Sequence, residues 1–220
     1  MRELSELIQV DEPAWPMVQA WIAAANKPVE VLPRDPARAE AAVLKLQVTT
    51  HAVLGAIAWE TGGLLIDSGW IRVLGSGSAR MNESLITWNH GDATAECVFV
   101  AHDVLGGVFA LDGGALGHGQ GDVFYFAPES LDWEQCDCGY PGLLQFLLTG
   151  DLEKFYAGSR WPGWRDEVAR LSPDQGFALD PVPWTPEGKD LSRASRTPVP
   201  IRELVARALQ ASRQLAGDGR

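Results

Sequence analysis

Histidine and aspartate residues gather in one apolar stretch of the sequence, between residues 97 and 126. Imidazole and carboxylate groups could hold a zinc ion or act as acid and base. Adjacent side chains on a strand point to opposite faces, however, so His102 and Asp103 would diverge. Strand-end aspartates commonly bond turn amides, so we predict turn capping here, with no metal site and no cofactor. The residues concerned are His102, Asp103, Asp112, His118 and Asp122.

The cysteines offer a second possible chemistry. Cys136 and Cys138 stand two residues apart, which differs from the Cys-x-x-Cys spacing of zinc sites, and no second pair completes four ligands. Cys97 lies in an apolar run, where a thiol is usually a small buried hydrophobe. Residues 1–10 lack the unbroken apolar core of an export signal. We therefore predict unpaired thiols and a cytoplasmic location.

Other catalytic patterns are incomplete in this sequence. The Gly-Ser-Gly-Ser motif at 75–78 does not have the strand, turn and helix order of a nucleophile elbow. The glycine run at 117–121 is not followed by the Gly-Lys-Ser/Thr of a phosphate loop. Glu60 and Asp67 flank a Gly-Gly turn and could face each other as paired carboxylates, but solvated hairpin ends explain them as well. We assign no catalytic residue.

Tryptophan is frequent, with nine residues in the chain, and suggests a binding surface. Four of them, Trp59, Trp70, Trp88 and Trp133, lie on or beside predicted strands and have acidic neighbours. Aromatic centres with charged rims are typical of partner sites, but helices could equally cover this face and make the indoles core. The hypothetical binding residues are Trp59, Glu60, Asp67, Trp70, Asp103, Asp112, Trp133 and Glu134, with Trp88 and Asp132 beside them.

The net charge of −11 limits the possible partners. A surface this acidic would repel a phosphate backbone, so nucleic-acid binding is disfavoured, while a basic protein or a small molecule would suit it. The sequence has no apolar run long enough to span a membrane. A homo-oligomer that uses the tryptophan surface as its own interface is a further possibility.

The order of helical and strand patterns predicts a single α+β domain over residues 1–216, with a frayed tail at 217–220. Helical spacing indicates helices in residues 1–50, with Asp11 and Asp35 as N-caps. An antiparallel sheet of about six strands follows in residues 51–127, and residues 128–216 form C-terminal helices with a wrapping segment. The predicted strands are 53–59, 64–67, 70–74, 97–102, 107–112 and 122–126, with links short enough for hairpins.

Several short segments of the sequence resemble a bacterial family of uncharacterised proteins, and the resemblance covers nearly the whole chain. They are Asp11-Glu-Pro-Ala-Trp-Pro, Gln47-Val-Thr-Thr, Glu60-Thr-Gly-Gly, Asp103-Val-Leu-Gly-Gly-Val-Phe-Ala, Phe124-Tyr-Phe-Ala-Pro and Trp161-Pro-Gly-Trp. More distantly, the strand ending at Asp112, the strand Val123-Phe-Tyr-Phe and the Phe146-Leu147 pair are similar to the SUKH superfamily of Syd-like and toxin-immunity proteins. This resemblance implies binding without a conserved catalytic set. The region after Trp161 has no counterpart in it.

Two main hypotheses about function follow. The first is a non-enzymatic, cytoplasmic protein-binding module, immunity-like by resemblance, with an acidic and tryptophan-rich surface that faces a basic partner such as a nuclease toxin. The alternative is an enzyme or small-ligand-binding protein with a site at strand ends near His102, Asp103 and Asp112. The alternative predicts a concave pocket in which these polar groups converge.

Overall fold

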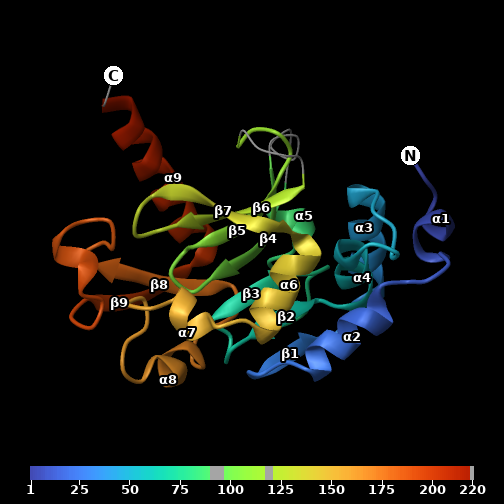
Figure 1. Cartoon of the computed structure of the whole chain (residues 1–220), viewed down its shortest axis with the longest axis horizontal. Helices are drawn as coiled ribbons and strands as arrows, with labels where there is room; N and C mark the ends of the chain where they lie inside the picture. The colour runs from blue at the N-terminus through green and yellow to red at the C-terminus, as the bar shows by residue number, and fades with distance from the viewer. Residues whose placement is uncertain (90–96, 117–120, 219–220) are drawn as a thin grey trace.

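The computed structural model describes residues 1–89, 97–116 and 121–218. Figure 1 shows the N-terminal helices at one end of the molecule and the C-terminal hairpin and helix at the other, with a sheet between them. The first part of the chain contains α1 (Leu4–Ile8), α2 (Trp15–Ala23), β1 (Val29–Leu32), α3 (Pro36–Leu46) and α4 (Val53–Glu60). The central part contains β2 (Gly63–Ile66), β3 (Ile71–Leu74), α5 (Leu85–Trp88), β4 (Cys97–Asp103), β5 (Val108–Asp112), β6 (Asp122–Ala127) and β7 (Asp132–Gly139). The last part contains α6 (Tyr140–Thr149), α7 (Leu152–Phe155), α8 (Trp164–Val168), β8 (Gln175–Asp180), the short 3-10 helix η2 (Glu187–Lys189), β9 (Ser195–Pro200) and α9 (Ile201–Asp218).

The main sheet has seven antiparallel strands in the order β1 to β7, so each strand pairs with the strand before it in the chain. The mixed α+β architecture with an antiparallel sheet is therefore confirmed. The predicted strand number was too low, because β1 and β7 extend the sheet on both sides of residues 51–127. A separate two-stranded sheet, β8–β9, occupies much of the segment predicted to wrap around the molecule.

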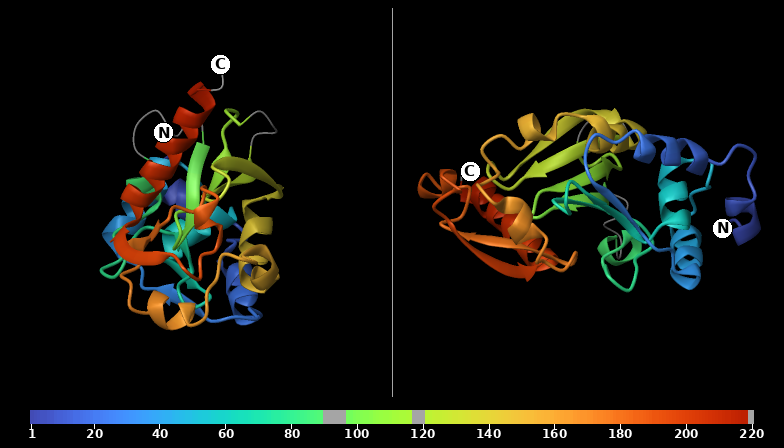
Figure 2. Two further views of the ribbon diagram at one scale, coloured as in Figure 1. Left: turned by 90° about the vertical axis from the view of Figure 1, so that its left-hand side faces the viewer. Right: turned by 90° about the horizontal axis from the view of Figure 1, so that it is seen from below.

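The two faces of the main sheet are covered by different helices. Val108 and Phe126 are paired across β5 and β6 and pack with α9, whereas their neighbours Phe109 and Tyr125 belong to the larger core cluster that contains α6. Because side chains alternate along a strand, these contacts define an α9 face and an α6 face. Figure 2 shows the same arrangement from two further directions.

One predicted strand is wrong. Residues 53–59 form most of α4, a helix buried on most of its surface through Val53, Ala56, Ile57 and Ala58. A short apolar run has the same composition in a buried helix and in a buried strand, so its periodicity does not separate the two.

The predicted N-caps differ in outcome. Asp35 caps α3 as expected, because its Oδ1 accepts hydrogen bonds from the backbone amides of Ala37 and Arg38 (3.0 and 3.2 Å). Asp11 does not cap α2, which begins at Trp15 after Ala14. Among the described residues, no helix is long and apolar enough to cross a membrane.

Candidate functional site

His102 and Asp103 lie on opposite faces of β4, as the alternation along a strand predicted. The ring of His102 stacks on Trp88 at a centroid distance of 5.2 Å, on the α9 face. Asp103 points to the α6 face, where the hydroxyls of Tyr125 and Tyr156 donate hydrogen bonds to its Oδ2 (2.8 and 3.3 Å). The two groups therefore do not converge on one reacting atom.

Asp103 caps the turn between β4 and β5. Its Oδ1 accepts from the backbone amides of Leu105 (2.8 Å) and Gly107 (3.0 Å). A Cβ at Gly107 would lie 2.2 Å from Asp103 Oδ2 and 2.2 Å from the Tyr125 hydroxyl, so this close packing requires glycine. Burial raises the pKa of Asp103 to about 6, against the hydrogen bonds from Tyr125 and the two amides, which lower it. The predicted turn capping is confirmed here.

Asp112 plays the same part after β5. Its Oδ1 accepts from the backbone amides of Gly114 (2.7 Å) and Leu116 (3.1 Å). Asp122 instead accepts a hydrogen bond from the side chain of Gln135 on β7. His118 lies outside the described residues. In the parts of the chain that the structure describes, no group of three or more histidine, cysteine, aspartate or glutamate side chains could hold a metal ion.

Asp67 and Trp70 belong to the core and not to an exposed binding surface, which corrects their predicted placement. Asp67 forms an ion pair with Arg160 at 2.6 Å, and both side chains are about 5% exposed. The Arg160 guanidinium lies 5.0 Å from the centroid of the fully buried Trp70 ring and 4.4 Å from that of Trp164. Glu60 ends helix α4, so it does not mirror Asp67 across a hairpin.

The predicted tryptophans do not share one face. Trp59 is half-buried under Arg34, whose guanidinium lies 3.8 Å from the ring centroid. Trp88 and Trp133 both contact Phe99, at centroid distances of 5.8 and 6.4 Å. Glu134 pairs with Tyr125 on the α6 face, whereas Trp133 pairs with Phe126 on the α9 face. Alternation along β7 thus separates a tryptophan and a carboxylate that adjoin in the sequence.

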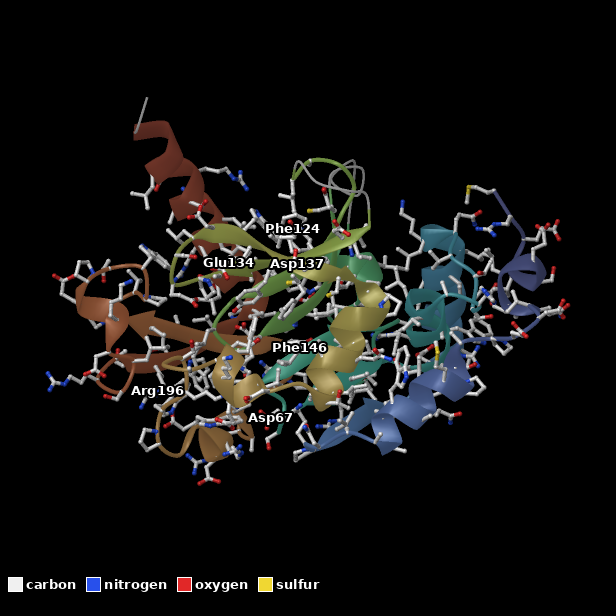
Figure 3. All side chains as sticks on the ribbon, in the orientation of Figure 1. Asp67, Phe124, Glu134, Asp137, Phe146 and Arg196 are labelled. Atoms are coloured by element: carbon white, nitrogen blue, oxygen red, sulfur yellow. The ribbon has the colours of Figure 1, made fainter. Side chains whose placement is uncertain are left out.

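A different surface, which we call the β7 surface, lies along the last strand of the main sheet. It consists of β7 and the β7 groove, a hollow of about 330 Å³ between this strand and helices α6 and α7. Figure 3 shows Glu134 and Asp137 along the strand and Phe146 on the helix. Aromatic and aliphatic side chains line most of the groove, with Glu134 at its edge: Phe109, Tyr125, Leu143, Phe146 and Phe155, beside Cys136 and Cys138.

The thiols on β7 are poor nucleophiles. The pKa of Cys136 is raised to about 12, mainly by burial and in smaller part by Cys138, Glu134 and Asp137, which disfavour the thiolate by charge repulsion. The pKa of Cys138 is raised by burial as well. Cys136 and Cys138 are free thiols, as predicted for this pair. These side chains contribute to the groove as apolar surface.

The sequence reasoning missed the groove and also missed Arg72 on β3. The groove requires β7 and α7 to be adjacent in space, which no local pattern reveals. Arg72 did give a signal, because a single charge stands inside the apolar strand Ile71–Leu74. Its side chain is fully buried in the fold.

Comparison with known proteins identifies a family match and related bacterial sequences. Residues 4–204 match the family described as "Protein of unknown function DUF2625". The chain belongs to this family. A relative in Escherichia coli (strain K12), YbfG, is 41% identical over 186 residues, which cover 84% of this chain and 86% of the relative. A relative from Haemophilus influenzae, titled "Uncharacterized protein", is 37% identical over 187 residues and covers 82% of each chain. The expected bacterial family is thus confirmed, and no solved structure matches the chain.

Proposed function

We propose that this DUF2625 protein is a non-enzymatic protein-binding module whose partner docks on the β7 surface. The observation that carries the proposal is the combination of an apolar groove with an acidic strand at the edge of the sheet. Aromatic centres that exclude water inside a charged rim are the usual anatomy of a protein interface.

The position of β7 in the sheet supports docking. Among the described strands, β7 is at the end of the main sheet and pairs with β6 alone, and the other edge of such a strand can accept a partner strand. Partners often bind by adding a strand to such an edge and placing side chains in adjacent pockets. The half-exposed Phe155 ring, 37% accessible, offers apolar area next to that edge.

The charge of the surface favours a basic partner. Asp132, Glu134 and Asp137 are exposed along β7, and no ion pair within the described residues involves any of the three. The net charge of −11 extends the attraction beyond the contact itself, because a long-range field speeds encounter with a cationic protein.

The residues of the alternative site support the binding proposal over an enzyme. Asp103 and Asp112 already bond turn amides, and His102 points to the other face of the sheet from Asp103. A general base must reach the proton that it abstracts. Carboxylates that hold turns are not free to do so.

Three finer features belong to the same proposal. The SUKH-like order of β5, β6 and α6 suggests a relationship to the toxin-immunity proteins, in which case the basic partner is a nuclease toxin. The free thiols of Cys136 and Cys138 suit a cytoplasmic setting. The tryptophans contribute to the partner surface only through Trp133, which is half-buried on β7.

The test is a charge reversal on β7. Tagged full-length protein is produced in its native host and cross-linked, and captured proteins are compared between wild type and the double variant Glu134→Lys/Asp137→Lys. We expect a basic partner that wild type retains, that 0.5 M salt releases and that the double variant captures at least about tenfold less, because one fully reversed charge contact changes binding by more than 1.4 kcal/mol.

The control is Glu40→Lys/Asp166→Lys, which changes the net charge equally at two exposed positions away from β7. The control should capture the partner as wild type does. Equal capture by wild type and the β7 variant contradicts the proposal, and so does turnover of a metabolite by a protein that captures no partner.

A further inference from the structure

Arg72 is a charged side chain buried inside the sheet. It is 2% exposed, and among the described residues its Nε and Nη1 atoms have no hydrogen-bond partner. In the sheet register, Arg72 on β3 stands between Leu65 on β2 and His102 on β4, so it points to the α9 face. Buried guanidinium groups are normally paired, because the protein interior solvates charge poorly.

The carboxylates around Arg72 are already engaged elsewhere. Asp174 accepts hydrogen bonds from the backbone amides of Asn82 and Glu83, each at 3.0 Å. Glu30 forms an ion pair with Arg80. Asp103 lies on the opposite face and binds turn amides and tyrosine hydroxyls. In the described part of the chain, none of these carboxylates forms an ion pair with the guanidinium of Arg72.

The neighbouring His102 does not supply a counter-charge either. The pKa of His102 is lowered to about 3, mainly by burial and in smaller part by the positive charge of Arg72, so the ring is neutral near pH 7. Burial also lowers the pKa of Arg72, to about 10, while Asp103 and Asp174 oppose the shift. The guanidinium therefore stays positively charged at neutral pH.

Arg72 lines a cavity of about 310 Å³ between the first three strands and the segment that follows α8. Glu30, Leu65 and Arg72 form one cross-strand row, and all three contribute to the wall. The segment at the end of α8 and after it adds apolar residues to the lining, among them Val168, Leu171 and Pro173. A buried cation and several apolar side chains in one cavity lining are the features that a small amphiphilic acid requires.

We propose that this cavity binds a small organic acid, whose oxyanion head pairs with the guanidinium of Arg72 and whose apolar body lies against Val168 and Leu171. An arginine side chain can donate two parallel hydrogen bonds to a carboxylate or a phosphate, which supplies both charge and direction. The cavity shares no lining residue with the β7 groove, so this binding is independent of the partner surface.

The experiment titrates the full-length protein with probes that separate the contribution of the head from that of the apolar body. Hexanoate and hexyl phosphate carry the two oxyanions, hexanamide carries a neutral head, and inorganic phosphate has no apolar body. We expect calorimetric binding and a higher melting temperature with one or both acids, at least tenfold weaker binding of hexanamide, and little response to phosphate alone. The preferred acid identifies the class of head.

The matched variants are Arg72→Met and Arg170→Met, which each remove one positive charge, from the cavity and from an exposed position respectively. Arg170→Met should bind the acid as wild type does, and Arg72→Met at least tenfold more weakly. Without ligand, Arg72→Met should melt at or above the wild-type temperature, because a buried uncompensated charge is replaced by an apolar chain.

Four results would overturn the proposal. They are no binding of either acid by wild type, hexanamide binding equal to that of the acids, equal binding by Arg72→Met, and a large fall in the melting temperature of ligand-free Arg72→Met. The last result would show that the guanidinium stabilises the fold by itself. The probe comparison uses wild type alone, so it tests the class of ligand independently of the variants.

Discussion

At the scale of single residues, the sheet controls the ionisation of His102. The ring is fully buried between strands, with Trp88 stacked on it, and neither ring nitrogen has a hydrogen-bond partner within the described parts of the chain. A charged imidazolium there would have no solvation and would lie beside Arg72. The fold therefore favours the neutral ring, and stability must depend on pH through this group.

We predict that His102→Leu makes the protein less sensitive to acid. The pKa of His102 is about 3 in the fold and 6.5 as an ordinary value, so the unfolded chain binds more protons between these limits. Wild-type stability should thus fall as pH drops from 6.5 towards 3, by up to about 1.4 kcal/mol per pH unit, and the variant should lack this component. Urea unfolding at pH 7, 5.5 and 4 measures the difference.

The control for this prediction is His51→Leu, which removes an exposed histidine. Its stability should follow the wild-type curve with pH. A gap between wild type and His102→Leu that stays constant over the three pH values would contradict the argument.

Residue roles set by neighbours in the chain could be predicted from the sequence, and roles set by distant residues could not. Asp103 and Asp112 cap turns within four residues of themselves, which their strand-end positions indicated. The Tyr156 hydroxyl that reaches Asp103 comes from 53 residues away. No spacing rule connects Tyr156 with Asp103, so this hydrogen bond could be found only from the fold.

At the scale of elements, helix α3 tests how much one cap contributes. Asp35 accepts two backbone hydrogen bonds at the first turn of this helix. We predict that Asp35→Ala lowers the free energy of unfolding by about 1 kcal/mol, the usual effect of losing an N-cap. Equilibrium urea unfolding provides the measurement.

Asp11→Ala is the matched control, because Asp11 is exposed and caps no helix. We expect a change within about 0.5 kcal/mol, as for other surface substitutions. Equal losses in the two variants would show that Asp35 acts through its charge or another contact and not as a cap.

The strands that sequence patterns predicted correctly are the buried ones with strong apolar runs, β2 to β6. The missed strands β1 and β7 are the two edge strands of the main sheet. An edge strand has a neighbouring strand on one side alone, so its sequence contains fewer apolar residues that would mark it as a strand. β7 contains Asp132, Glu134 and Asp137, residues that favour turns or solvent over strands. Strands β8 and β9 were missed because proline and polar residues dominate their segment.

At the scale of the whole molecule, one buried ion pair joins the sheet to the C-terminal part of the chain. Asp67 follows β2, whereas Arg160 precedes α8 and is enclosed by Trp70, Tyr156 and Trp164. Removing one partner of a buried pair leaves the other charge uncompensated, which is more costly than losing the attraction alone.

We predict that Arg160→Met destabilises the protein by about 3–5 kcal/mol, and that Asp67→Asn/Arg160→Met loses less, because no buried charge then remains unpaired. Urea unfolding of the two single variants and the double variant measures the coupling. Arg165→Met serves as control, since this arginine is exposed and lies 3.9 Å from Asp67, and it should cost less than about 1 kcal/mol. A double variant less stable than either single one would contradict the prediction.

The chain-order sheet also has a consequence for protein synthesis. Each strand can pair with its predecessor as soon as both have left the ribosome, so the sheet can grow during translation. The buried ion pair and the helix that covers the sheet form later. Arg160 is synthesised 93 residues after Asp67, and α9, which packs on Val108 and Phe126, is synthesised later still. A nascent chain therefore exposes an apolar face of the sheet to solvent. We expect it to depend most on chaperones at the stage before α9 emerges.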